Sequence, residues 1–119
     1  MHKTARIARL SQLTDMVLDA KLAQLNKAAA QCQKTKQQIE NLTGSAPEIG
    51  AGVGISDAIT ALNYQNWAEK RRVELGQILA LQSAFRLDAR DAAYFAFGRS
   101  RGMQIMAARV VASGASNKD

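Results

Sequence analysis

Several residue types are scarce in this chain of 119 residues, and each scarcity excludes a class of protein. There is one proline, one cysteine (Cys32) and one histidine (His2). A single cysteine cannot form an internal disulfide, which is typical of a reducing compartment and indicates a cytoplasmic protein. One histidine beside the first residue suggests neither a catalytic Ser-His-Asp arrangement nor a set of converging metal ligands. We therefore expect no enzyme activity, no metal site and no cofactor.

Long apolar stretches are missing as well. No run approaches the ~20 apolar residues that a membrane-spanning helix needs, and the first residues lack the apolar segment of a signal peptide. We therefore expect a protein that is not transmembrane. There are also only six aromatic residues, fewer than the core of a compact globule usually holds. The remaining composition is rich in alanine, leucine, glutamine, lysine and arginine, which favour helices.

The first half of the chain predicts one long helix, from Thr4 to Thr43, because it contains neither proline nor glycine. Apolar residues recur there at heptad spacing, namely Leu18, Leu25, Cys32 and Ile39. Leu22 and Ala29 supply a second row four residues after the first, and Lys36 interrupts that row. Nearer the N-terminus a stripe in a shifted register consists of Ile7, Leu10, Leu13 and Val17.

The break between the helices is predicted at residues 44–54, which include Pro47 and alternating glycines. Gly44 is placed to end the first helix, and Ser56 or Asp57 to cap the next one. We expect the second helix to span residues 55–112, with a kink or frayed turn at Gly98 or Gly102, and residues 113–119 to be disordered. Its predicted apolar stripe consists of Ile55, Ile59, Leu62, Leu75, Ile78, Phe85, Ala89, Ala92, Ala96, Met103, Met106 and Val110.

These patterns predict a single all-α domain, a long antiparallel two-helix coiled-coil hairpin. A loop centred near residue 49 predicts that facing residues have numbers adding up to about 99. That rule places Cys32 opposite Trp67. It also predicts that the second helix overhangs the first beyond about residue 96, because the second helix is longer.

Charge is the strongest functional signal in the sequence, with a formal net charge of +6. Basic residues gather near both termini, and no acid lies between Asp91 and Asp119. A hairpin brings the termini together, so we expect a docking end for an acidic protein partner. Adaptable methionines in the overhang add apolar contacts. The predicted partner-binding residues are Arg6, Arg9, Arg99, Arg101, Met103, Met106 and Arg109.

The densest aromatic patch is Tyr94, Phe95 and Phe97. These three side chains point in different directions on a helix, so a single neighbouring helix cannot cover all of them. At least one should be exposed unless a partner covers it, and such surface often marks an interface. Self-association, and hence a homo-oligomer, is one way to cover it.

In its length, its basic charge and its basic terminal end carrying Arg6, Arg9, Arg99 and Arg101, the chain resembles the FliJ family of flagellar export proteins and the related stalk proteins of type III secretion. That resemblance implies a cytoplasmic antiparallel coiled coil that inserts into a hexameric export ATPase and serves protein transport. The chain departs from the family in its glycine-rich loop, in the glycines of its second helix and in being short.

Two other classes of protein remain open. A nucleic-acid-associated helical protein would use the positive charge for phosphate contacts. However, the sequence has no dense run of lysine and arginine, and its aromatic residues are not interleaved with the basic ones. We therefore expect no specific nucleic-acid partner. The other class is a scaffold or secretion-chaperone hairpin of a different kind.

Overall fold

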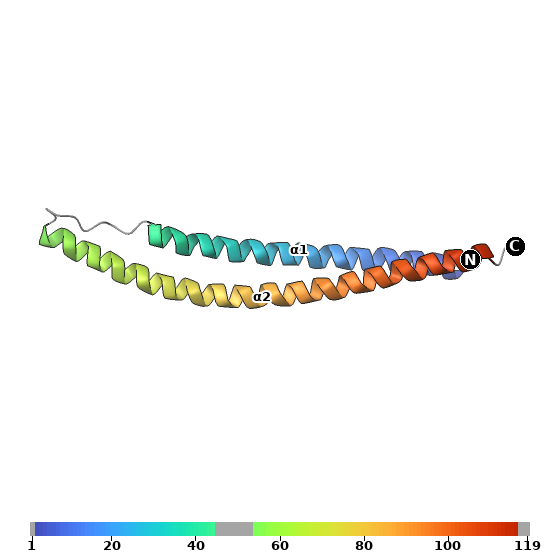
Figure 1. Ribbon diagram of the computed structural model, residues 1–119. Coiled ribbons are helices and arrows are strands. Elements are labelled where there is room, and N and C mark those ends of the chain that lie inside the picture. The colour runs from blue at the N-terminus through green and yellow to red at the C-terminus, as the bar shows by residue number, and fades with distance from the viewer. Residues whose placement is uncertain (1, 45–53, 117–119) are drawn as a thin grey trace. The chain divides into compact units, whose positions relative to one another are not determined.

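The computed structural model describes residues 2–44 and 54–116. Two helices account for nearly all of them, α1 (His2–Gly44) and α2 (Ile55–Ser116), which run in opposite directions (Figure 1). The predicted all-α, antiparallel two-helix hairpin is therefore confirmed. Within the described part of the chain, no helix is long and apolar enough to cross a membrane.

Residue contacts divide the hairpin into two compact units, and each unit holds a piece of both helices. We call Met1–Lys27 with Arg86–Asp119 the terminal unit, and Ala28–Phe85 the central unit. The division falls within both helices, which continue through it without a break in their backbone hydrogen bonding.

The helix ends differ slightly from the predicted ones. The carbonyl oxygen of Gly54 accepts a hydrogen bond from the Ala58 amide at 3.0 Å, so Gly54 is the N-cap of α2, and the prediction of Ser56 or Asp57 is wrong. Asp57 instead lies in the first turn, where its negative charge interacts favourably with the helix dipole. At its other end α2 continues to Ser116, four residues past the predicted end. Residues 113–116 of the predicted disordered tail are therefore helical, and that prediction is wrong for them. Residues 45–53 of the predicted loop at 44–54 and the last three residues of the predicted tail lie outside the described residues.

The seam between the helices is made of residues that alternate at spacings of three and four. On α1 the buried and half-buried seam residues are Ile7, Ser11, Thr14, Leu18, Lys21, Leu25, Ala28, Cys32, Thr35, Ile39 and Leu42. On α2 they are Ala58, Ala61, Ala68, Arg72, Leu75, Leu79, Gln82, Ala89, Ala93, Ala96, Ser100, Met103, Ala107 and Val110. The most deeply buried of them are small, and Leu75 is the one large side chain in the buried class among the described residues. Small side chains allow two helices to approach closely.

One row of each predicted stripe is confirmed by this seam and the other row is wrong. The row Leu18, Leu25, Cys32 and Ile39 lies in the seam, as does the row from Leu75 through Ala89 and Ala96 to Val110. The second row of α1 follows the first by three residues, not four, so that Thr35 is buried and Leu22 is exposed. On α2, exposed side chains include Ile55, Ile59, Leu62, Ile78, Phe85 and Met106. Hydrophobicity did not identify these rows because most of the deeply buried seam residues are small.

The pairing register also differs from the prediction. In the central unit the Thr35 hydroxyl donates to Oε1 of Gln82 at 2.5 Å. In the terminal unit the Ser100 hydroxyl donates to Oδ1 of Asp15 at 2.5 Å. Thr35 and Ser100 are both buried. The numbers of these facing residues add up to about 116 rather than about 99, because α2 begins well before the position that faces the end of α1.

Two predictions that depended on the old register are therefore wrong. Trp67 does not lie opposite Cys32: its side chain is 54% exposed, and it lines a groove with Gln38, Asn41 and Leu42. Likewise, α2 beyond residue 96 is not an overhang, because Ser100 bonds to α1 and Met103 lies half-buried in the seam.

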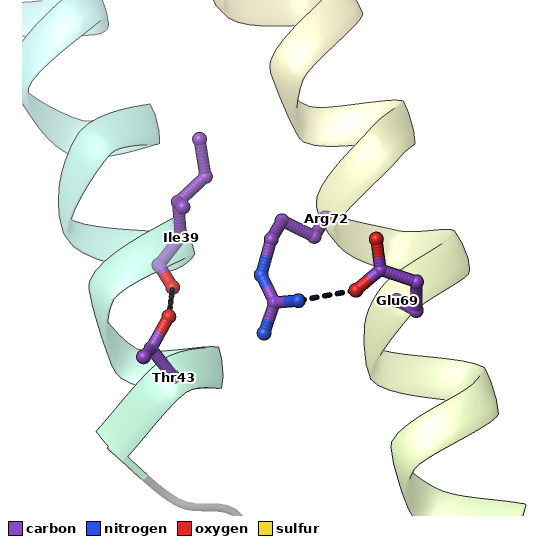
Figure 2. Close-up of polar contacts among 4 residues, drawn as sticks. All are labelled: Ile39, Thr43, Glu69 and Arg72. Atoms are coloured by element: carbon purple, nitrogen blue, oxygen red, sulfur yellow. Dashed lines mark hydrogen bonds and ion pairs between the residues drawn. The ribbon is translucent and has the colours of Figure 1, made fainter.

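The last turn of α1 is consistent with the same pairing register. Figure 2 shows Arg72 reaching from α2 into the space beside Ile39 and Thr43 on α1, where it also bonds to Glu69 of its own helix. The Thr43 hydroxyl donates to the Ile39 carbonyl oxygen at 3.2 Å. The last turn of α1 contains no basic residue. A cation near a helix C-terminus is favourable, and here α2 supplies it.

Leu75 should contribute more to stability than the exposed leucines of the central unit do. Leu75→Ala removes a side chain that is 3% exposed, so we expect a loss of about 2–5 kcal/mol in the free energy of unfolding, measured in urea. Leu62→Ala is the control, since Leu62 is exposed, and should cost less than about 1 kcal/mol. Equal losses for the two variants would contradict the seam described here.

Gly98 and Gly102 lie inside α2, which runs through both positions. At each of them an added Cβ would meet nothing within 4 Å. Gly98→Ala and Gly102→Ala should therefore each raise the unfolding free energy by about 1 kcal/mol, the difference in helix propensity. Ala84→Gly, at an exposed position of the same helix, should lower it by a similar amount. A destabilising Gly98→Ala would mean that the backbone departs from a helix at this point.

Candidate partner-binding surface

The net positive charge of the chain belongs to the terminal unit. By sequence that unit contains eleven basic and five acidic residues, whereas the central unit contains five of each. All seven predicted partner-binding residues lie in the terminal unit. Their arginines, Arg6, Arg9, Arg99, Arg101 and Arg109, are exposed. Of the two methionines, Met106 is exposed and Met103 is half-buried in the seam.

One groove of the terminal unit is apolar. Leu10, Leu13 and Val17 of α1 line it, together with Thr14, and α2 contributes Ala96 and Arg99. The three apolar α1 residues belong to the predicted stripe in the shifted register, and each is about half exposed. Ile7, the fourth residue of that stripe, is half-buried in the seam. The other three lie outside the seam because Ser11 and Thr14 occupy the corresponding positions, so they form surface.

Arg99 sits at the edge of this groove with its guanidinium carbon 5.4 Å from the centroid of the Phe95 ring. A second pair follows the same arrangement, with the Arg90 guanidinium carbon 6.0 Å from the Tyr94 centroid. A cation over an aromatic face is favourable by about 0.5–1 kcal/mol at exposed sites. These contacts hold two cations against flat apolar rings on the outside of α2.

A different groove lies around Arg101. Asp15 and Asp19 of α1 line it, with Ser100 and Phe97 of α2 among the other lining residues. The two acids offset the charge of Arg101 locally, and the Ser100 hydroxyl holds the Asp15 carboxylate. Residues two apart on a helix point about 200° apart. Arg99 and Arg101 therefore belong to different faces, so the predicted docking residues surround the terminal unit and do not form one patch.

The aromatic patch behaves as the sequence indicated. Tyr94, Phe95 and Phe97 are all exposed, each by more than half. At least one had been expected to be exposed, and the structure leaves all three on the surface. With the groove beside Arg99, they give the terminal unit apolar as well as charged surface.

Within residues 2–44 and 54–116 no three His, Cys, Asp or Glu side chains are arranged to hold a metal ion. Cys32 is a free cysteine and is buried in the seam. Comparison of the chain with protein-family models, with curated proteins and with solved structures found no match.

The hydrogen bond between Ser100 and Asp15 should contribute to the stability of the terminal unit. Ser100→Ala removes the hydroxyl that bonds Asp15 across the seam, and it leaves a half-buried carboxylate without that donor. We expect a loss of about 1–2 kcal/mol in unfolding free energy at neutral pH. Ser113→Ala, an exposed serine near the end of α2, is the matched control and should change stability by less than about 0.5 kcal/mol.

Proposed function

We propose that this chain is a non-catalytic, cytoplasmic interaction protein whose terminal unit binds an acidic protein partner. The observation that supports the proposal is the segregation of charge, since the whole formal charge of +6 falls in one unit and the other is neutral. Charge concentrated in this way steers encounter with an oppositely charged partner. The apolar groove of Leu10, Leu13 and Val17 supplies the contacts that charge alone does not.

The most specific form of the proposal is a stalk of the FliJ type, with a hexameric export ATPase as the acidic partner. Supporting it are the two-helix hairpin, the length of the chain and the basic residues near both termini. In this role the terminal unit enters or caps the ring, and Arg6, Arg9 and Arg109 guide it there. The function is protein transport in flagellar or type III secretion.

Nucleic-acid binding is the second candidate, and one structural observation favours it. Arg90 lies over Tyr94 and Arg99 over Phe95, so two cations on α2 are each paired with an exposed ring. Proteins that bind single strands combine a positive surface with rings on which bases stack. The acidic-partner proposal is preferred because charged and apolar surface lie together in a groove.

Charge reversal tests the proposal. The variant Arg99→Glu with Arg101→Glu should weaken binding to the export ATPase of the same organism by about tenfold or more, because it removes most of the net positive charge of the terminal unit and places a negative charge beside the apolar groove. The control, Lys34→Glu with Lys36→Glu, makes the same change in net charge within the central unit and should bind normally. Binding is measured by fluorescence anisotropy of the labelled chain, with helicity checked by circular dichroism.

The other outcomes are equally informative. If both variants bind the ATPase as tightly as the unchanged chain, the terminal unit is not the docking surface. If the ATPase does not bind, but a single-stranded DNA of about 30 nucleotides binds with steep salt dependence and the terminal-unit variant loses it, the nucleic-acid candidate replaces this one.

A further inference from the structure

A second line of apolar residues runs along α2 in the central unit, outside the seam. We call Tyr64, Trp67, Ile78, Leu81 and Phe85 the outer stripe. Together with two intervening residues, Arg71 and Glu74, they follow the same alternation of three and four residues as the seam. A helix with two such lines has the pattern of a helix that packs against two neighbours. In this hairpin α1 occupies the seam, and of the outer stripe it leaves Trp67, Ile78, Leu81 and Phe85 exposed and Tyr64 half-buried.

The outer stripe lies beside two grooves of the same unit. Tyr64 and Trp67 line a groove with Gln38 and Leu42, and Ile78 lines the next groove along the helices. The α1 wall of these grooves is mostly polar, with Gln31, Lys34, Gln38 and Asn41. The Tyr64 and Trp67 rings also contact each other, with centroids 5.8 Å apart. The face thus carries an apolar ridge directly alongside a groove.

The charges on this face balance within one molecule. Arg71 and Glu74, which interrupt the outer stripe, form an ion pair at 3.2 Å, and Arg72 and Glu69 form another. The central unit as a whole has as many acids as bases. A face of this kind does not select a charged partner, and two identical copies of it do not repel each other. The terminal unit, which holds the net charge, would repel its own copy.

We propose that the outer stripe binds a second copy of this chain about a two-fold axis, with the two α2 helices antiparallel. The ridge of Ile78, Leu81 and Phe85 from each copy then lies over the groove beside Tyr64 and Trp67 of the other. Ridge and groove belong to the same face, as an isologous interface requires. The axis falls near Arg71 and Glu74, whose charges are paired within each copy. This inference does not depend on the partner of the terminal unit.

The exposed area of the outer stripe is large enough for a specific but modest interface. Trp67, Ile78, Leu81 and Phe85 are 54%, 41%, 65% and 68% exposed. With large side chains presenting on the order of 200 Å² each, these four leave roughly 400 Å² on each copy. Two copies with their neighbouring residues bury about 1,000 Å², which is below the size of most stable interfaces and in the range of weak, reversible ones. We therefore expect a weak, reversible dimer.

Analytical ultracentrifugation of the purified chain tests the proposal. Across a concentration series the mass should rise from 12.9 kDa toward twice that value. The variant Leu81→Gln with Phe85→Gln should raise the dissociation constant at least about tenfold, because polar amides replace the ridge. The control, Leu62→Gln with Val73→Gln, alters two residues of the same unit that are also about half exposed but lie off the outer stripe, and it should dimerise normally.

Salt distinguishes this interface from association through charge. Dimerisation should change little between about 0.05 M and about 0.5 M salt, since apolar contacts are not screened. The proposal is overturned if the chain stays monomeric up to about 1 mM, if the ridge variant dimerises as well as the unchanged chain, or if the control variant dissociates equally. A mass above that of a dimer would also overturn it, because a two-fold interface closes after two copies.

Discussion

Close contact between small side chains in the seam is the constraint on which the rest of this structure depends. Alanine, serine, threonine and cysteine contribute little apolar area each, so the seam gains from close packing of backbones more than from bulk. Two buried polar contacts, Thr35 with Gln82 and Ser100 with Asp15, lie in this seam, one in each unit. A buried hydroxyl without a partner costs about 1–3 kcal/mol, so the Ser100 contact penalises a shifted register that would separate it from Asp15. The Thr35 hydroxyl also lies 3.2 Å from the Gln31 carbonyl oxygen of its own helix, so its contact with Gln82 adds less to this penalty.

The distribution of large side chains follows from this seam. With small residues between the helices, most of the large apolar residues lie outside, as the groove of Leu10, Leu13 and Val17 and the outer stripe of α2 both illustrate. The two proposed binding surfaces then differ in charge. The terminal unit combines arginines with apolar surface, whereas the central unit offers a neutral face. One hairpin can in this way present surfaces for two different kinds of partner.

Much of the fold could be predicted from sequence, because helix propensity and the position of glycine and proline are local properties. The two helices, their approximate ends and the row through Leu18, Leu25 and Cys32 are all confirmed. The second rows could not be found by hydrophobicity, since Thr35 is a seam residue and Leu22 is not. Spacing alone indicated that Thr35 belongs to the seam, because it follows Cys32 by three residues.

The pairing register, and the surfaces that depend on it, could not be predicted from the sequence for a different reason. A rule that counts outward from the loop assumes that the two helices end level with each other, and here α2 begins before the position that faces Gly44. Trp67 therefore lies in an exposed groove, and Met103 lies half-buried in the seam. The concentration of basic residues toward the termini, by contrast, needed only the antiparallel arrangement, and all seven predicted partner-binding residues lie in one unit. Their separation onto different faces required the structure.

Disulfide trapping measures the register directly. With Cys32 replaced by alanine, the pair Thr35→Cys and Gln82→Cys occupies positions whose side chains meet across the seam. The pair Thr35→Cys and Tyr64→Cys occupies positions that would face each other if the numbers added up to about 99. Under mild oxidation of dilute protein, the account predicts an intramolecular disulfide in the first pair and none in the second. The opposite result would contradict the small-residue seam and every surface assigned from it.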